Sequence, residues 1–281
     1  MINEKINIES IQGSEQNMDN RSIGMFDSGV GGLTVLKEVQ KELPQENIIY
    51  LGDTKRFPYG SKSKESIVQL TQKGMDFLIS QDVKAIVIAC GTATSQALEE
   101  MQKRYRIPIM GIIDSTVQYI EQKKNLKTVG VIATAGTIRS RGWEKKLKEQ
   151  ITGIEVKSKA CPLLAPMAEE GWINNEIARL TIQEYLKDMK EVDALILGCT
   201  HYPLFEPLIK EELGSAVEII HTGKLVSKQL KELLFQSEEE GNASPTNTQI
   251  YLTDRETNFI QVASILLENK EIAKQIKEIQ I

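Results

Sequence analysis

The chain has 281 residues, of which 41% are hydrophobic and 26% are charged, and its formal net charge is -5. These values are ordinary for a soluble globular protein of one large or two medium domains. A negative net charge provides no general attraction to nucleic acid or to anionic membranes, and no apolar run approaches the ~20 residues of a transmembrane helix. We therefore expect neither nucleic acid nor a membrane among its partners.

The first twenty residues and the cysteines indicate the setting of the protein. Residues 1–20 are polar and lack the apolar segment of a signal peptide, so we expect a disordered tail. Three cysteines in a chain of this size, without a secretory leader, predict a reducing compartment rather than a disulfide framework. The expected location is the cytoplasm.

After residue 20 the sequence alternates short strands with helices. A strand at 23–27 leads through the glycine-rich turn 28–32 into a helix at 33–42, and a strand at 47–52 ends at Asp53. A helix at about 62–80, a strand at 85–88, a helix from 93 and a strand at 107–113 complete a first block. The chain then crosses to a second block around residues 114–125. Strands alternating with helices predict a parallel α/β sheet.

The second block repeats this order. It has a strand from 128, a helix at 138–150, a strand at 154–160, a helix at 174–190, a strand ending at Cys199, a short strand near 217–220 and a helix at 223–235. A polar loop covers 237–247, and a strand at 249–252 precedes a helix from about 257. We expect this last unit to return to the first block. The predicted domains are residues 21–115 plus 225–281, and residues 116–224.

Two cysteines occupy matching positions in the two blocks. Cys90 and Cys199 each follow a Val-x-Ala start, a run of apolar residues and a small residue, and a threonine follows each within two residues. A second pair of strands, at 23–27 and 129–134, ends in similar Ser/Thr-Gly turns. These repeats predict two similar halves. The carboxyl ends of parallel strands are where open α/β folds bind ligands, so the thiols lie at candidate ligand-binding edges.

The two thiols allow several functions. A redox pair, a metal site that includes His201, and a pair of acid/base groups acting on opposite faces of one carbon are all possible, as is a structural role for two buried hydrophobic cysteines. Neither cysteine lies in a C-x-x-C motif, and the chain has only two histidines. The polar residues Thr92, Thr200 and His201 beside the cysteines favour chemistry. A helix beginning after each cysteine would lower the pKa of its thiol.

The ordered motifs resemble those of glutamate racemases, in the aspartate/glutamate racemase superfamily. The resemblance covers nearly the whole chain after residue 22 and rests on these stretches: Phe26-Asp27-Ser28-Gly29-Val30-Gly31-Gly32-Leu33-Thr34, Gly52-Asp53, Pro58-Tyr59-Gly60, Ala89-Cys90-x-Thr92-Ala93, Cys161-Pro162-Leu163, Glu169-Glu170-Gly171 and Gly198-Cys199-Thr200-His201-Tyr202-Pro203-Leu204. It implies an α/β fold of two pseudo-symmetric three-layer domains with the active site between them. It also implies catalysis without a cofactor or metal, and a homodimer.

The resemblance also implies roles for individual residues. Cys90 would deprotonate D-glutamate with help from Asp27, and Cys199 would deprotonate L-glutamate with help from His201 and a loop carboxylate, for which we favour Glu169 over Glu170. Cys161 would be structural. The implied substrate-binding residues are Asp27, Ser28, Pro58, Tyr59, Gly60, Gly91, Thr92, Cys199, Thr200 and His201.

The sequence departs from the family pattern at three places. Gly91 stands where the family has an asparagine that contacts substrate, Trp143 replaces a common tyrosine, and residues 114–116 read Asp-Ser-Thr instead of Glu-Pro-Gly. The last two changes are expected to affect packing. The absence of the asparagine at Gly91 allows three outcomes: a weak enzyme, a substrate contact replaced by water, or a different substrate. The leading hypothesis is racemisation of glutamate for peptidoglycan synthesis, with another amino acid such as aspartate, or a non-catalytic ligand-binding relative, as alternatives.

Overall fold

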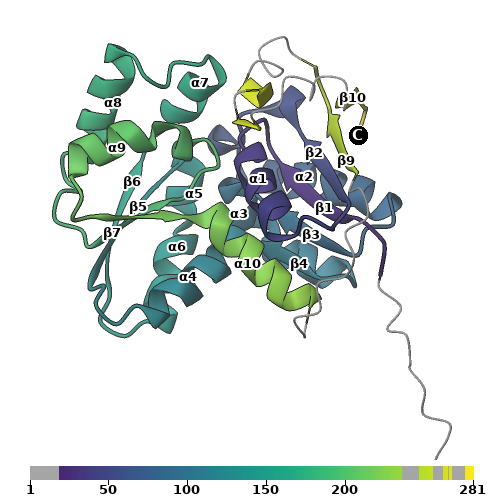
Figure 1. The fold of residues 1–281 in the computed structure, drawn as a ribbon, viewed down its shortest axis with the longest axis horizontal. Helices are drawn as coiled ribbons and strands as arrows, with labels where there is room; N and C mark the ends of the chain where they lie inside the picture. The colour runs from purple at the N-terminus through teal and green to yellow at the C-terminus, as the bar shows by residue number, and fades with distance from the viewer. Residues whose placement is uncertain (1–18, 236–246, 256–261, 265, 268–275) are drawn as a thin grey trace, which may run out of the picture.

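The computed structural model describes residues 19–235, 247–255, 262–264, 266–267 and 276–281. The described strands form two parallel sheets, one with the order β10-β9-β2-β1-β3-β4 and the other with the order β6-β5-β7-β8 (Figure 1). Helices cover both sheets. The predicted α/β class with two similar halves is confirmed. Residues 1–18 of the predicted tail lie outside the described residues, whereas the backbone oxygen of Asp19 accepts a hydrogen bond from Lys84 Nζ.

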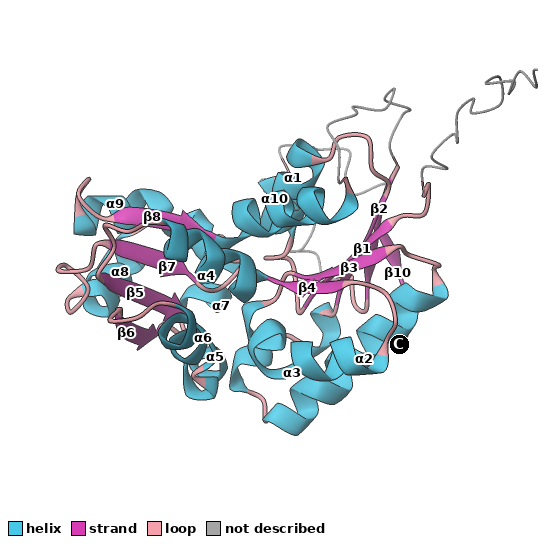
Figure 2. Ribbon diagram, turned by 90° about the horizontal axis from the view of Figure 1, so that it is seen from below, coloured by secondary structure: helices cyan, strands magenta, loops and turns pink. Residues whose placement is uncertain are grey.

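The first sheet has its central strands buried on both faces. Along β3, Ala85 and Val87 face one hydrophobic cluster and Ile86 and Ile88 face another, which is the alternation that a doubly covered strand requires. Helices α1 and α10 lie on one face and α2 and α3 on the other (Figure 2). The bounds are β1 Ile23–Asp27, α1 Leu33–Glu42, β2 Ile48–Gly52, α2 Lys64–Ser80, β3 Ala85–Ile88, α3 Gly91–Arg104, β4 Ile109–Gly111, α10 Thr222–Leu234, β9 Thr248–Leu252 and β10 Ile276–Glu278.

The second sheet is likewise a central layer between helices. Leu195 and Leu197 of β7 pack in one cluster with α7, α8 and α9, while Ala194 and Ile196 pack in the other with α4 and α6. The bounds are α4 Ile112–Gln122, β5 Thr128–Ala133, α5 Ala135–Ser140, α6 Gly142–Gln150, β6 Glu155–Ala160, α7 Leu164–Glu169, α8 Glu176–Leu186, β7 Ala194–Leu197, α9 Glu206–Leu213 and β8 Glu218–His221. Three short 3-10 helices cover Thr54–Arg56, Tyr59–Ser61 and Tyr202–Phe205.

The halves are joined through α4 and α10, which share one hydrophobic cluster with both sheets. After the second sheet, the chain returns to the first, where β9 pairs with β2 in parallel and Ile48 lies opposite Thr248. The domain bounds, residues 21–115 plus 225–281 and residues 116–224, stay a prediction. The predicted loop at 237–247 and the predicted helix from 257 lie almost entirely outside the described residues.

Some predicted elements differ from the structure. The strand predicted at 107–113 ends at Gly111, and Ile112–Gln122 is a helix rather than a simple crossing. The helix predicted at 138–150 is two helices, because Arg141 has a left-handed backbone with φ of 55°. The helix predicted at 174–190 is shorter, since Asn175 caps it by accepting from the Ala178 amide at 2.9 Å. Within the described part of the chain, no helix has the length and apolarity to cross a membrane.

Candidate active site

The two cysteines lie at the carboxyl ends of matching strands, as predicted. Cys90 follows β3 directly after Ala89, and Cys199 follows β7 after Gly198. Both side chains are buried, with exposed fractions of 5% and 7%. Low solvent exposure strengthens electrostatic interactions between groups at such a site, so the pKa of each neighbouring group matters.

Hydroxyl and carboxyl groups surround Cys90. Its Sγ donates a hydrogen bond to Ser28 Oγ at 3.3 Å. The Asp27 carboxylate accepts from the Gly29 amide at 3.0 Å and from Thr200 Oγ1, in the other half, at 3.4 Å. Burial raises the pKa of Asp27 to about 6, although the nearby His201 opposes the shift. Burial, followed by the charge of Asp27, raises the pKa of the Cys90 thiol to about 12.

A histidine lies beside Cys199, and a carboxylate lies beside that histidine. The Sγ of Cys199 lies 3.8 Å from Nδ1 of His201, and Nε2 of the same ring lies 2.7 Å from Glu169 Oε1. Burial disfavours the charged imidazole, but the hydrogen bonds and charges of Cys199 and Glu169 outweigh it and raise the pKa of His201 well above its usual value. Glu169 makes this contact, whereas Glu170 is exposed. The aromatic ring of Phe57 lies 5.5 Å from that of His201.

The predicted lowering of both thiol pKa values by helix N-termini is wrong for Cys90 and lacks its structural basis for Cys199. Cys90 is the N-cap of α3, yet burial outweighs the helix and its pKa rises. No α-helix begins after Cys199, because Tyr202–Phe205 is a 3-10 helix and α9 starts only at Glu206. Helix N-termini therefore do not explain how these thiols would ionise, and the neighbouring side chains are the remaining candidates.

The loop with Pro58, Tyr59 and Gly60 reaches the second half. Tyr59 Oη donates to Asp53 Oδ2 at 2.6 Å, and Asp53 Oδ1 also accepts from Arg56 Nη1 at 2.7 Å. These bonds turn the Tyr59 hydroxyl towards the first domain. The backbone at Gly60 then lies against Thr134, since a Cβ at Gly60 would be 2.6 Å from Thr134 Cβ. The loop can therefore present backbone groups between the halves.

A triangle of hydroxyls was missed in the sequence. Thr92 Oγ1 lies 2.8 Å from Thr134 Oγ1 and 3.1 Å from Thr137 Oγ1, and the last two are 2.9 Å apart. Thr92 belongs to the first half and the other two to the second. Their signal was present, because the turn 134–137 matches the Asp27-Ser28-Gly29 turn in the internal repeat. The structure thus brings Asp27 to Thr200, Gly60 to Thr134 and Thr92 to Thr134 and Thr137 at the junction of the halves.

The structure bears on the other interpretations of the cysteines. All three are free thiols, and Cys161 Sγ is 3.8 Å from the Lys159 backbone oxygen. Across the described ranges, no three His, Cys, Asp or Glu side chains are grouped as metal ligands. A buried thiol that only packs would not require a carboxylate, an imidazole and several hydroxyls around it. The surroundings of Cys90 and Cys199 favour the acid/base interpretation.

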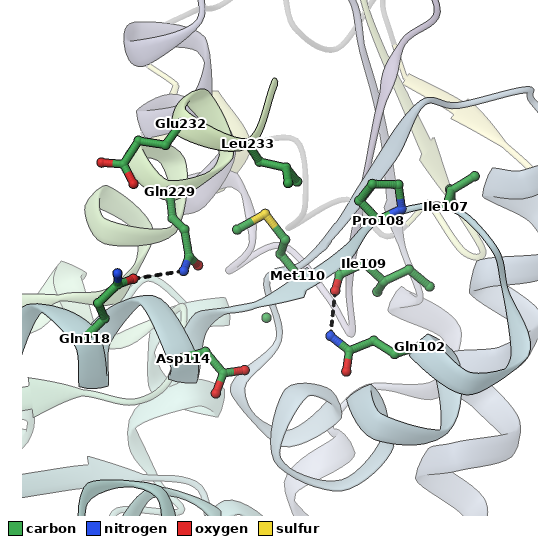
Figure 3. A pocket seen from close by; sticks show the side chains of 11 residues that line it. Gln102, Ile107, Pro108, Ile109, Met110, Asp114, Gln118, Gln229, Glu232 and Leu233 are labelled. Carbon is green, nitrogen blue, oxygen red and sulfur yellow. Dashed lines mark hydrogen bonds between the residues drawn. The ribbon is translucent and has the colours of Figure 1, made fainter. Parts of the chain in front are cut away.

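A separate cavity of about 580 Å³ lies among α3, β4, α4 and α10 (Figure 3). It is bordered by the amides of Gln102, Gln118 and Gln229 and by the acids Asp114 and Glu232, and Gln229 Nε2 donates to Gln118 Oε1 at 3.1 Å. Its lining contains neither Cys90 nor Cys199. The cavity is therefore distinct from the candidate active site.

Comparisons with known proteins agree with the geometry. The Asp/Glu/Hydantoin racemase family model matches residues 31–230. A glutamate racemase of Geobacter metallireducens is 43% identical over 89% of this chain and 94% of its own, and one of Aquifex aeolicus is 41% identical over 92% and 98%. The crystal structure of a Francisella tularensis glutamate racemase in complex with D-glutamate has a TM-score of 0.86 at 38% identity, covering 93% of this chain and 98% of that one. The resemblance inferred from the motifs is confirmed, and the chain belongs to the Asp/Glu/hydantoin racemase family.

Proposed function

We propose that this racemase interconverts L-glutamate and D-glutamate with two cysteines as acid and base, and without a cofactor. The observation that carries the proposal is the pair of thiols at matching strand ends: Cys90 is hydrogen-bonded to Ser28 and feels the charge of Asp27, and Cys199 lies beside His201. The relatives of 43% and 41% identity are glutamate racemases, which favours glutamate as the substrate.

The proposed reaction balances two proton transfers. In the L-to-D direction, the Cys199 thiolate removes the α-proton, and the Cys90 thiol gives its proton to the opposite face of the same carbon. Cys199 ends as a thiol and Cys90 as a thiolate, and the reverse reaction uses these forms. His201 stabilises the Cys199 thiolate as an imidazolium, and Asp27 handles the proton of Cys90.

The remaining site residues would bind the substrate. We assign its carboxylates and amine to the hydroxyls of Ser28, Thr92 and Thr200, to backbone groups of the loop Pro58–Tyr59–Gly60, and to the polar edges at Asp27, Gly91, Cys199 and His201. The hydroxyls of Thr134 and Thr137 orient Thr92 across the junction. Hydrogen bonds to a charged ligand contribute about 1.5 to 3 kcal/mol each, so a few such contacts are sufficient to hold glutamate.

The cellular role follows from the proposed reaction. D-Glutamate made in the cytoplasm would supply peptidoglycan synthesis, and thereby cell-wall biogenesis and cell shape. A homodimer is the expected assembly, from the family resemblance. Analytical ultracentrifugation tests this expectation directly, since a dimer sediments at twice the mass of the 31.5 kDa chain.

Circular dichroism of purified protein tests the function. The protein is mixed separately with L-glutamate, D-glutamate, L-aspartate and D-aspartate, with no pyridoxal phosphate added. We expect the optical signal of either glutamate enantiomer to decay to zero, because the equilibrium mixture is racemic. Decay with aspartate and none with glutamate would establish the alternative substrate. An unchanged signal for all four would overturn the assignment as an acidic amino-acid racemase.

A further inference from the structure

Gly91 contacts the other half of the molecule through a backbone atom. It is the first residue of α3, directly after Cys90, and a Cβ atom built on it would lie 2.2 Å from the oxygen of Gly198. Real Cβ atoms essentially never approach a neighbour within 3.0 Å. Gly91 is not among the glycines with positive φ, so the requirement for glycine here is steric. Only glycine fits at this position while the halves stand as they do.

The same contact joins the residues beside the two thiols. Gly91 follows Cys90, and Gly198 precedes Cys199. The side chain of Ile112 lies 3.5 Å from the same Cβ position, so the space that a side chain would use is already filled. The Cβ position at residue 91 is therefore occupied by the opposite half and not open to water. The missing side chain is replaced by a carbonyl from the opposite half.

At two other glycines of this junction, the obstacle to a Cβ atom is a side chain rather than the backbone. A Cβ on Gly31 would meet the His201 ring at 2.4 Å, and one on Gly60 would meet Thr134 at 2.6 Å, but both obstacles are side chains. The Gly198 oxygen belongs to the backbone, and the amide of the same residue donates to Ile132 O at 2.8 Å. A side chain at position 91 must therefore move one half relative to the other.

We propose that Gly91 is a positioning residue that sets the separation of the Cys90 and Cys199 thiols. By lacking a side chain, it lets the Gly198 carbonyl lie against the start of α3, and this contact fixes the distance at which both sulfurs reach one α-carbon. The inference rests on the proposed two-cysteine function. A side chain at position 91 would displace one thiol by about 1 Å, and a misplacement of that size costs about a hundredfold in rate.

The test compares Gly91→Ala and Gly91→Asn with Gly142→Ala. The control also adds a methyl group between the halves, but its Cβ would lie 3.2 Å from Ser95 Cβ, a tight contact that needs a shift of only a few tenths of an ångström. We expect kcat for glutamate to fall about 10- to 100-fold in both Gly91 variants with KM changed less than about threefold, and the control to keep its kcat. Unchanged kcat in Gly91→Ala, or a higher kcat in Gly91→Asn, would overturn the proposal.

A structural measurement separates this proposal from the proposed function. If the parent protein racemises neither glutamate enantiomer, the function is wrong, but crystal structures of the parent and of Gly91→Ala still test the contact. We expect the distance from the residue 91 Cα to the Gly198 oxygen to lengthen by about 1 Å in the variant, as a displaced backbone requires. An unchanged distance would contradict the positioning role. If Gly91→Asn does not fold, the single methyl of Gly91→Ala carries both measurements.

Discussion

The edges that carry Cys90 and Cys199 are alike in backbone and different in chemistry. Each follows a four-residue strand whose residues are all buried, Ala85–Ile88 in one half and Ala194–Leu197 in the other. Cys90 then begins a helix of 14 residues, whereas Cys199 leads into a turn and a 3-10 helix. The two halves thus share the strand that positions the thiol and differ in the residues around it.

The difference gives the two thiols ionisable neighbours of opposite kinds, a carboxyl group beside one and an imidazole beside the other. On the first edge, the neighbouring ionisable group is the Asp27 carboxyl, and burial together with this group raises the pKa of Cys90 to about 12. On the second edge it is His201, whose own pKa is raised by its partners Cys199 and Glu169 despite burial. A two-base racemase needs one proton donor and one acceptor at the start of each turnover. Under the proposed mechanism, the raised pKa of the Cys90 thiol makes it the proton donor when L-glutamate is the substrate.

Replacing either cysteine should have the largest effect. Cys90→Ser and Cys199→Ser should each lower racemisation by at least about a thousandfold, because serine is a far weaker acid than cysteine. The two variants should differ with a β-substituted glutamate analogue, which loses its leaving group after deprotonation on one face. Cys90→Ser should eliminate only from the L analogue and Cys199→Ser only from the D analogue. Near-normal racemisation in either variant would show that its cysteine is only structural.

Changing the partner of each thiol should lower activity less than replacing the thiol. Each change should again affect only one enantiomer of the analogue. His201→Asn and Asp27→Asn should lower kcat/KM for racemisation about 100-fold, the range of a lost acid/base group. The fall must be equal in both directions, because the equilibrium constant between enantiomers is one. Elimination from the analogue is irreversible and reveals the side affected: L for His201→Asn and D for Asp27→Asn. Equal losses from both enantiomers would contradict the separate roles.

Removing the charge of the carboxylate beside His201 should lower kcat/KM about tenfold. Glu169→Gln keeps the size of the side chain but removes the charge that helps hold His201 protonated, so the pKa of His201 should fall. Activity that depends on the imidazolium would then be lost at a lower pH, which a pH profile of kcat/KM measures. Glu170→Gln is the matched control, because Glu170 is exposed and should leave the profile unchanged. Identical pH profiles for the two variants would show that Glu169 does not assist Cys199 through His201.

The smallest effect concerns stability on the Cys90 side. The folded Asp27 carboxyl ionises near pH 6 instead of its usual 3.8, so the folded state binds a proton more tightly than the unfolded chain between these values. Stability is therefore lost as pH rises from about 4 to about 6, by about 2 to 3 kcal/mol. Asp27→Asn lacks this loss. Its melting temperature relative to the parent should rise by several degrees across that range and stay level above it, and a constant difference would contradict the shifted pKa.

The sequence was most informative about the strands that carry the site. A strand covered on both faces must be a short continuous apolar run, and the runs at 23–27 and 85–88 became β1 and β3 with those bounds. The positions of Cys90 and Cys199 after such strands, together with the repeat, were sufficient to expect them at facing edges. The contact of Glu169 with His201 agrees with the preference for Glu169 over Glu170.

Three features could not be predicted from the sequence because they depend on tertiary contacts. The apolar run at 107–113 reads as one strand, but the chain turns into α4 at Ile112, where that helix packs against both sheets. The hydroxyl triangle of Thr92 depends on two halves meeting, which no local pattern encodes. The sign of the Cys90 pKa shift was missed for the same reason, because a helix N-terminus can be read from sequence whereas the extent of burial cannot.

The pairing of β9 with β2 has a consequence for the order of synthesis. The strands of the second sheet, β5 to β8, follow one another along the chain, so that sheet can be completed as soon as residue 221 has been made. The outer edge of β2 has no partner until residues 248–252 emerge. Unpaired strand edges are sites of aggregation during folding. The half with Cys199 can therefore mature first on the ribosome, while the half with Cys90 begins earlier and waits for the last strands of the chain.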